Sequence, residues 1–161
     1  MQFIKRYLPD SLSTRDKVRQ RKELTKSRNL YKQRKYYTRK AMRSFKSKPS
    51  KHLDKARRIY HVENIRPTKE LSRRTGCSVK GLRQIVKKGE GAYYSSGSRP
   101  NQTSQSWGLA RLASAITGGK SAVVDFDIIN KGCSHKKKAF ILANSARRKY
   151  KYGHTKTKLF E

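Results

Sequence analysis

Apolar residues recur at helical spacing in several short stretches of this chain. In the clearest stretch, four of them fall at positions i, i+3, i+4 and i+7: Leu109, Leu112, Ala113 and Ile116. Trp107 and Ala110 widen this stripe, and Gly118 and Gly119 follow it. Because residues at these spacings share one face of an α-helix, the stretch predicts an amphipathic helix that buries this face.

Two shorter helices, joined by a tight turn, are predicted upstream of it. Thr68 is placed to cap the first helix, and Gly76 is placed to end it. Ser78 is placed to cap the second helix, which Gly89 is expected to stop. The apolar stripe of the second helix consists of Val79, Leu82, Ile85 and Val86.

Three further segments show weaker helical patterns. One follows a break at Pro49 and has a single apolar face: Leu53, Ala56 and Tyr60. Another is a short turn that Asp125 can cap and Gly132 can end, although residues 123–126 (VVDF) can form a brief strand instead. The last has an apolar face near the end of the chain: Ala139, Leu142, Ala143, Ala146 and Tyr150.

These patterns predict a mainly α protein with a small helical domain between two basic extensions. We expect a basic arm at residues 1–50, the helical domain at residues 51–132, and a basic helix and tail at residues 133–161. Residues 13–48 are rich in helix formers, but their apolar residues are too sparse for a continuous stripe. We therefore expect the arm to be disordered in the free protein and to become helical on a partner.

The net charge narrows the class of partner. The chain has 161 residues with 42 Lys and Arg against 10 Asp and Glu, a formal charge of +32. Repulsion among these positive charges opposes a compact state, so we expect the protein to bind a negatively charged partner. No apolar run is long enough to span a bilayer, and the N-terminus lacks the pattern of a secretory signal.

Candidate chemistry is sparse. Cys77 and Cys133 are too few for a disulfide framework, so we expect two buried thiols in a reducing compartment. Neither cysteine belongs to a paired spacing of the kind that binds zinc. We therefore expect no metal, no cofactor, no small-molecule substrate and no enzymatic activity.

The stretch GAYYSSGSRPNQT at residues 91–103 has two interpretations. It can be a structural loop in which Tyr93 or Tyr94 packs near Trp107 and Pro100 fixes the backbone before the next helix. It can also bind an anion, because hydroxyl groups and a guanidinium would converge near a helix N-terminus. The side chains that would do so are Ser95, Ser96, Ser98 and Arg99. We favour the structural loop, with Arg99 as its one contact that reaches outward.

Two other groups of residues suggest contact with nucleic acid. Residues 70–86 match the spacing of a helix-turn-helix, which would present Lys80, Arg83 and Lys87 to DNA. An ordinary pair of packed helices has the same spacing, and these cations can equally face solvent or a protein. In the arm, tyrosines alternate with cations and can stack on bases while the cations contact phosphates. The arm residues concerned are Tyr36, Tyr37 and Arg39.

Three segments of the chain read RRTGCS (73–78), KGEGAYYSSGSRPNQT (88–103) and SWGLARLASAITGGK (106–120). They resemble a family of small basic proteins, of uncharacterised biochemistry, that recurs in large double-stranded DNA viruses and as a related module in some phages. The basic segments 19–45 and 50–60 also resemble the larger viral members, so the resemblance covers about residues 10–135. It implies a viral origin and presence in the virus particle, and it supplies no catalytic residues.

We therefore expect a non-enzymatic structural protein of a large DNA virus particle. It would be a minor capsid or capsid-associated protein on the inner side of the shell, made in the host cytoplasm or virus factory. Its partners would be major or other minor capsid proteins, with packaged DNA or the headgroups of an inner membrane as further candidates. The alternative is a virion protein that binds packaged DNA through the helix-turn-helix-like segment and the basic arm.

Overall fold

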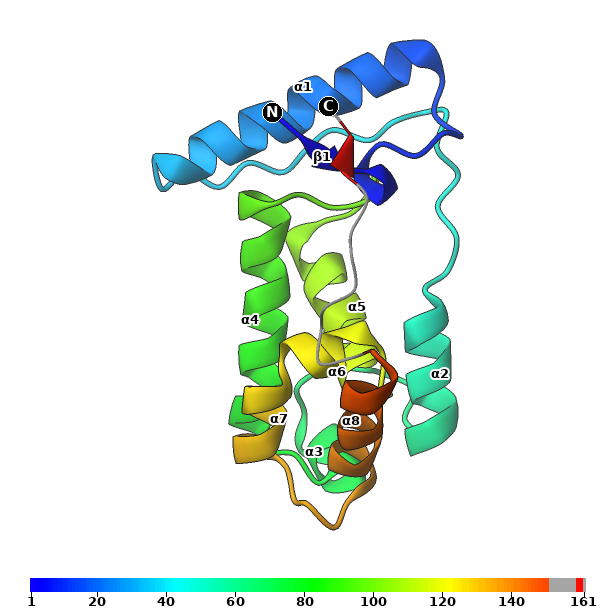
Figure 1. The fold of residues 1–161 in the computed structure, drawn as a ribbon, viewed down its shortest axis with the longest axis vertical. Coiled ribbons are helices and arrows are strands. Elements are labelled where there is room, and N and C mark those ends of the chain that lie inside the picture. The colour runs from blue at the N-terminus through cyan, green and yellow to red at the C-terminus, as the bar shows by residue number, and fades with distance from the viewer. Residues whose placement is uncertain (151–158, 161) are drawn as a thin grey trace. The chain divides into compact units, whose positions relative to one another are not determined.

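The chain folds mainly into α-helices. A computed structural model describes residues 1–150 and 159–160 (Figure 1), so the predicted tail beyond Tyr150 lies largely outside the described residues. Within the described part, the helices are α1 Thr14–Lys32, α2 Lys51–Tyr60, α3 Lys69–Thr75, α4 Val79–Ser95, α5 Ser104–Ile116, α6 Lys120–Val124, α7 Phe126–Gly132 and α8 Lys138–Lys149. A 3-10 turn at Lys5–Tyr7 follows strand β1, Phe3–Ile4, which pairs antiparallel with β2, Leu159–Phe160.

The helices form two compact units. Unit 1 contains residues 1–48 and 90–107 with strand β2, and unit 2 contains residues 49–89 and 108–150. This division differs from the expected one, in which residues 1–50 formed a separate arm and the helix after residue 133 formed a separate extension. The difference arises because the first 48 residues pack against 90–107, while α8 contributes to the core of unit 2.

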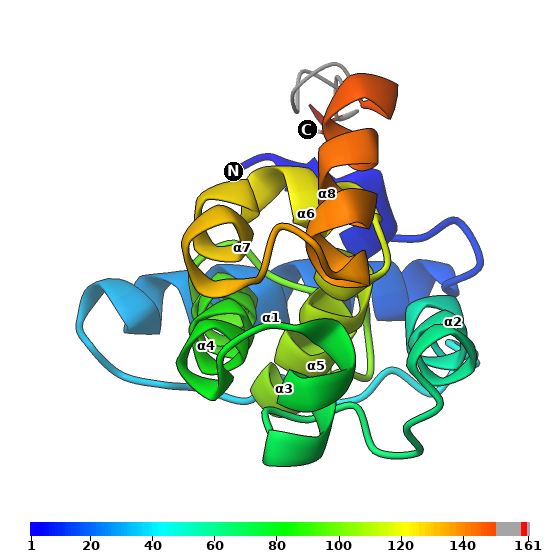
Figure 2. The ribbon, with the colours of Figure 1, turned by 90° about the horizontal axis from the view of Figure 1, so that it is seen from below.

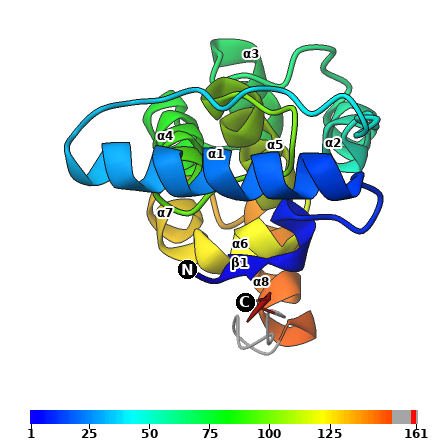
Figure 3. The same cartoon turned by 90° about the horizontal axis from the view of Figure 1, so that it is seen from above.

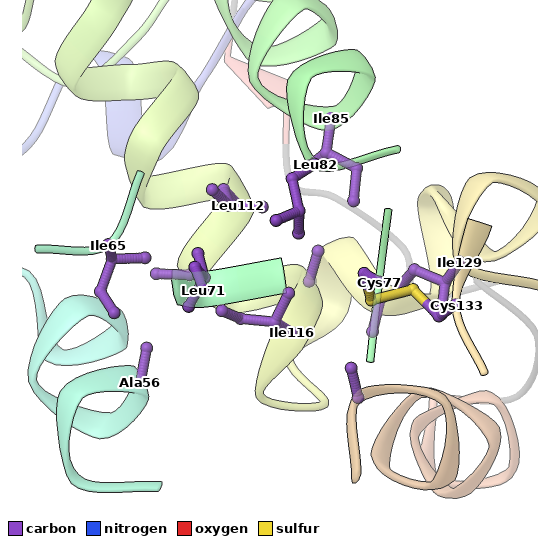
Figure 4. Close-up of a cluster of buried hydrophobic side chains, with 14 of the residues drawn as sticks. Ala56, Ile65, Leu71, Cys77, Leu82, Ile85, Leu112, Ile116, Ile129 and Cys133 are labelled. Atoms are coloured by element: carbon purple, nitrogen blue, oxygen red, sulfur yellow. A yellow bond between two sulfur atoms is a disulfide. The ribbon is translucent and has the colours of Figure 1, made fainter. Parts of the chain in front are cut away.

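In Figure 2, α5 lies among the other helices of unit 2, and its C-terminal half contributes Leu112, Ala113, Ala115 and Ile116 to the core of that unit. Most of the predicted stripe of α5 is buried there with most of the stripe of α4, as the sequence pattern indicated, while Leu109 and Val79 are half-buried. Side chains from α2, α3, α6, α7 and α8 complete this core, part of which is drawn in Figure 4. Its fully buried members include Leu71, Leu82, Leu112, Ile116, Ile129 and Ala143. Burying each large aliphatic side chain contributes about 1.5–3 kcal/mol, so these contacts are the main source of stability in this unit.

The helix termini of unit 2 follow the predicted caps. The hydroxyl of Thr68 accepts a hydrogen bond from Leu71 N–H, and Gly76 ends α3 with a φ of 79°. The hydroxyl of Ser78 accepts from Gly81 N–H at 3.1 Å at the start of α4. Local hydrogen-bonding chemistry therefore places the tight turn between α3 and α4.

Gly89 does not stop α4, contrary to the sequence-based prediction. The helix continues for six more residues to Ser95. A Cβ on Gly89 would lie 2.6 Å from the Cα of Gly108 in α5, a separation too short for two carbon atoms. Gly89 therefore lies at a close helix–helix contact that only glycine permits. The sequence-based prediction treated this glycine as the end of the helix and did not consider such a contact.

The two cysteines form a disulfide bond, which corrects the expectation of two free thiols. Cys77 and Cys133 are 56 residues apart and face each other in an isolated antiparallel bridge. Backbone hydrogen bonds flank the bond, from Ser78 N–H to Gly132 C=O and from Ser134 N–H to Gly76 C=O. The turn after α3 is thereby joined to the turn after α7 (Figure 4). The sequence could not reveal this pairing, because helix packing brings the two turns together.

The segment after Gly119 is helical, so the alternative of a brief strand at 123–126 is wrong. Asp125 precedes α7 but its carboxylate makes no cap bond. It instead accepts two hydrogen bonds of 2.7 Å from the guanidinium of Arg111, and Lys88 lies 3.7 Å away. A buried carboxylate is stabilised better by a paired guanidinium than by one backbone N–H, which accounts for this choice of partner.

The longest element of unit 1 is α1, and a segment of the chain returns along it. After α1, residues 33–48 run back beside the helix in an extended conformation (Figures 1 and 3). Side chains of α1 bind the backbone of this segment: Asp16 accepts from Ser44 N–H at 2.9 Å, and Glu23 accepts from Lys40 N–H at 2.8 Å. The two hydrogen bonds from Ser44 also hold the pKa of Asp16 below its usual value.

No helix in the described part of the chain is both long enough and apolar enough to cross a lipid bilayer.

The close approach of α4 and α5 predicts opposite effects for two neighbouring glycines of α4. Gly89→Ala forces a methyl group against the backbone of Gly108 and should lower the free energy of unfolding by about 1–3 kcal/mol. Gly91→Ala is the matched control, because nothing lies within 4 Å of its added Cβ. Alanine favours a helix by about 0.5–1 kcal/mol over glycine, so Gly91→Ala should be neutral or stabilising. Urea unfolding measures both variants, and equal effects would contradict the proposed contact.

Candidate functional site

The motif at residues 91–103 belongs to two structural elements. Residues 91–95 form the last turn of α4, and residues 96–103 form a loop that leads into α5. The backbone reverses at Gly97, with a φ of 128°, and at Asn101, with a φ of 63°. A Cβ on Gly97 would lie 2.8 Å from a methyl carbon of Leu24, so the loop packs closely on α1. Glycine is required at that position for both reasons.

Arg39 joins the returning segment to this motif. Its guanidinium donates to the carbonyl of Tyr93 at 2.6 Å, to Ser98 Oγ at 2.7 Å and to Ser27 Oγ at 2.8 Å. The guanidinium carbon also lies 3.8 Å from the centroid of the Tyr93 ring. In return, the hydroxyl of Tyr93 accepts from the backbone N–H of Arg39 at 2.9 Å. Arg39 is 8% exposed, so these interactions form inside unit 1.

No carboxylate hydrogen-bonds to the Arg39 guanidinium in the described part of the chain. Burial lowers the pKa of this side chain, and the nearby Tyr93 partly opposes that effect. Carbonyl, hydroxyl and ring dipoles thus replace the water that an exposed guanidinium would bind. This arrangement corrects the prediction that Arg39 and Ser98 contact an external partner, because both are buried and bonded to each other.

Asn101 makes a second connection between the motif and the returning segment. Its side-chain carbonyl accepts from Met42 N–H at 2.6 Å, and its amide group donates to the carbonyls of Met42 and Phe45. Arg28 of α1 adds a third connection by donating to the carbonyl of Ser96 at 2.8 Å. The motif therefore binds the first 48 residues of its own chain, which supports the structural-loop interpretation.

The hydroxyl groups of the motif do not form an anion cradle. Ser98 accepts from Arg39 and donates to the carbonyl of Arg99, while Ser95 and Ser96 are exposed. The N-terminus of α5 is capped from within. Thr103 Oγ1 accepts from Ser106 N–H at 3.1 Å, and Ser106 Oγ accepts from Thr103 N–H at 2.9 Å. Ser98 and the N-terminus of α5, which were expected to bind an anion, are therefore already occupied by hydrogen bonds within the protein.

The aromatic residues of the motif pack differently from the prediction. Trp107 makes an edge contact with the ring of Tyr7, at a centroid separation of 6.2 Å, and packs on the Phe3 and Leu24 cluster. Tyr93 and Tyr94 contact each other instead. Trp107 thus contacts Tyr7 of the N-terminal segment where a tyrosine of the motif was expected. Sequence patterns within the motif could not predict a partner from so distant a segment. Pro100 is buried in the loop, as a structural role requires.

Arg99 is exposed and points to the outside of unit 1, at the edge of a shallow hollow. The hollow has a volume of about 420 Å³ and is lined by Lys5, Arg6, Pro9, Asp10, Phe45 and Arg99. Asp10 lies 2.7 Å from Lys5 in an ion pair. Phe45 and Pro9 contribute apolar surface to the hollow, and Arg6 and Arg99 contribute positive charge, a combination that suits an acidic group of a partner protein.

The cations predicted for α4 border a groove in unit 2. Lys80 and Lys87 line a groove of about 590 Å³ between α4 and α7, and Lys88 and Lys131 line it as well. Asp127 is the one carboxylate among its lining residues. Arg83 is exposed but is not part of the groove. Such a groove can hold one or more phosphate groups by charge alone.

Close packing of α7 on α4 forms this groove. A Cβ on Gly81 would lie 3.6 Å from the Cα of Gly132, so two glycines meet where the helices approach each other. The first turns of α4 are therefore partly covered by α7, where a recognition helix would have to enter the major groove of DNA. Lys131 comes from α7, so the sequence pattern of the α3–α4 hairpin could not have identified it.

The predicted stacking residues of the N-terminal segment have separate environments. The hydroxyl of Tyr37 donates to Glu23 at 2.8 Å, and burial together with this carboxylate raises the pKa of that tyrosine. Tyr36 is 71% exposed and lies beside the rings of Tyr31 and Tyr94. Among the described residues, no cluster of three potential metal ligands occurs.

The bonds of Arg39 predict a large loss of stability on truncation. Arg39→Ala leaves three buried acceptors without their donor and should lower the free energy of unfolding by about 3 kcal/mol. Arg39→Lys should cause a smaller loss, because an ammonium keeps the charge but cannot reach all three acceptors. Thermal unfolding measures both effects. Limited proteolysis should cut residues 1–48 faster in Arg39→Ala than in the native protein.

Arg99→Ala is the matched control on the other side of the motif. Its side chain is exposed, so the melting temperature should stay within about 1 °C of the native value. An N-terminal segment that protease removes equally fast from the native protein and from Arg39→Ala would instead support the sequence-based expectation of a disordered arm.

Comparison with known proteins adds a family. No curated protein and no solved structure matches the chain. One family model matches residues 5–132, which includes α1, the returning segment, the motif loop and both sides of the α4–α7 groove. That match covers well over half of the 161 residues. The chain therefore belongs to the family described as "Family of unknown function (DUF5824)".

Proposed function

We propose that this protein is a non-enzymatic structural component of a large DNA virus particle. It is a minor capsid or capsid-associated protein that lies on the inner side of the shell. Its partners are other capsid proteins, and the packaged DNA or the headgroups of an inner membrane lie near it. The resemblance of the motif and its flanking segments to proteins of such viruses supports the viral part of this proposal.

The distribution of charge is the observation that carries the structural role. Three carboxylates are used internally: Asp16 and Glu23 bind the returning segment, and Asp125 is buried against Arg111. Most Lys and Arg side chains of the described residues are exposed, and the chain has 42 Lys and Arg against 10 Asp and Glu. Much of the surplus of +32 is therefore at the surface, where an external anionic partner can meet it. A surface facing acidic protein, lipid headgroups or DNA provides such neutralisation.

Arg99 and its hollow provide a candidate contact with a neighbouring capsid protein. The side chain is exposed, and the apolar floor at Phe45 and Pro9 can receive the stem of an acidic side chain. This contact deepens the proposal, because it places an acidic segment of the partner at a defined position of unit 1.

Gentle disassembly of purified particles tests the proposal. We expect the protein to stay with the shell after the genome is released, and Arg99→Ala to reduce its incorporation while the protein remains folded. Arg83→Ala, also exposed but in unit 2, is the control for a general loss of positive charge. Recovery of the protein with the extracted genome alone would contradict the capsid assignment.

The α4–α7 groove favours a second candidate function, contact with the phosphates of packaged DNA. Lys80, Lys87 and Lys131 line the groove and make no ion pair among the described residues. Because α7 covers part of α4, this contact would be with the DNA backbone and would be independent of sequence.

Salt-dependent DNA binding tests this second candidate. Each phosphate contact that is lost lowers the slope of log K against log salt concentration by about 1. We therefore expect Lys87→Ala and Lys131→Ala each to reduce the slope by about 1. Lys120→Ala is the control, because this exposed lysine of α6 is outside the groove. Equal slopes for all three variants would remove the groove from consideration.

A further inference from the structure

Three tyrosine rings from separate segments meet at the surface of unit 1. Tyr31 is in the last turn of α1, Tyr36 is in the returning segment, and Tyr94 is in the last turn of α4. The rings of Tyr31 and Tyr94 are nearly parallel, with 9° between their planes and 6.4 Å between their centroids. The Tyr36 ring lies 6.2 Å from the first and 5.2 Å from the second. We name these three rings the tyrosine cluster.

The tyrosine cluster is preorganised, because contacts with neighbouring residues hold its rings in place. Tyr94 also makes an edge contact with buried Tyr93 at 5.0 Å, and its hydroxyl bonds to Ser104 Oγ at 3.2 Å. Tyr31 and Tyr94 are half-buried, whereas Tyr36 is 71% exposed. Two supported rings thus hold one exposed ring, and the entropy cost of fixing Tyr36 is reduced before any ligand binds.

The surroundings of the cluster are cationic. Lys32, Arg34 and Lys35 lie between Tyr31 and Tyr36 in the chain, and all three are exposed. Across the part of the chain that the structure describes, none of these three makes an ion pair. Glu90, one turn before Tyr94 in α4, is the nearest carboxylate along that helix. Positive charge therefore outweighs negative charge at this site.

An exposed ring among cations selects a ligand that has both a flat π-face and negative charge. A purely apolar protein surface would have to remove water from three cations without replacing it, which is costly. A basic peptide would be repelled. A nucleotide satisfies both requirements, because its base can stack on a ring while its phosphate meets a Lys or Arg side chain.

We infer that the tyrosine cluster binds an unpaired base of single-stranded nucleic acid by stacking on Tyr36. The neighbouring phosphates contact Lys32, Arg34 and Lys35. In a duplex, each base is covered on both faces by its neighbours, so the cluster prefers single strands. This site goes beyond the proposed capsid role, and it is separate from the α4–α7 groove, whose contact with phosphates does not distinguish single from double strands.

Oligonucleotides with and without bases separate stacking from charge. Fluorescence anisotropy would compare a labelled oligo(dT) 12-mer with an abasic 12-mer that carries the same number of phosphates. The native protein should bind oligo(dT) more tightly. Tyr36→Ala should weaken binding to oligo(dT) by about 5-fold to 100-fold and leave binding to the abasic strand unchanged. Tyr36→Phe should retain the preference, because it keeps the ring.

Ile141→Ala is the matched control, since Ile141 is an exposed apolar residue of α8 in unit 2. It should behave as the native protein does on both strands. Equal affinity of the native protein for the two strands would overturn the inference, and so would an equal loss on both strands in Tyr36→Ala. A Tyr36→Ala protein that binds both strands normally but is not incorporated into particles would also overturn it, and would identify the cluster as a protein contact. The binding results on the two strands do not depend on whether the protein belongs to a virus particle, so they can fail independently of the proposed function.

Discussion

One buried cation holds unit 1 together. Arg39 is surrounded by the Tyr93 ring, the Tyr93 carbonyl and two serine hydroxyls, and no carboxylate bonds to it in the described residues. A buried guanidinium without a carboxylate partner is unfavourable unless hydrogen-bond acceptors and ring dipoles replace its water, so the partners of Arg39 must be positioned accurately. The glycine at position 97, the left-handed Asn101 and the buried Pro100 all shape the loop that provides this position. The unusual composition of the motif is therefore explained by the need to surround the Arg39 guanidinium with partners.

Unit 2 depends on different constraints. Its core is an ordinary apolar one, but its helices approach each other at two pairs of glycines, Gly89 with Gly108 and Gly81 with Gly132. The Cys77–Cys133 disulfide joins the turns that flank the second of these contacts. A bond that closes so long a loop restricts the unfolded chain, which compensates in part for the self-repulsion of a highly basic protein. The α4–α7 groove lies directly beside this disulfide-linked region.

Internal use of the acidic residues connects structure to function. Asp16, Glu23 and Asp125 each stabilise the chain that carries them, and only Arg19 and Lys88 among the exposed cations of the described residues lie within 4 Å of these three carboxylates. The positive groups then appear in three chemically distinct settings: a hollow with an apolar floor at Arg99, a groove of lysines, and an aromatic cluster with cations around it. A protein that lies between a shell and its contents needs such different contacts on one small chain, which is consistent with the role that we propose.

The sequence by itself determined the helical class, the apolar faces of α2, α4, α5 and α8, and the caps at Thr68, Gly76 and Ser78, because these features depend on neighbours within about eight residues. It did not reveal the packing of the first 48 residues. The buried face of α1 consists of Asp16, Gln20, Leu24 and Ser27, which is mostly polar, so hydrophobic periodicity could not detect it. Arg39, Tyr94 and Cys133 likewise meet partners from distant segments. Only the tertiary structure decided those contacts, because a polar or cationic side chain becomes a core residue when the fold brings enough hydrogen-bond partners to it.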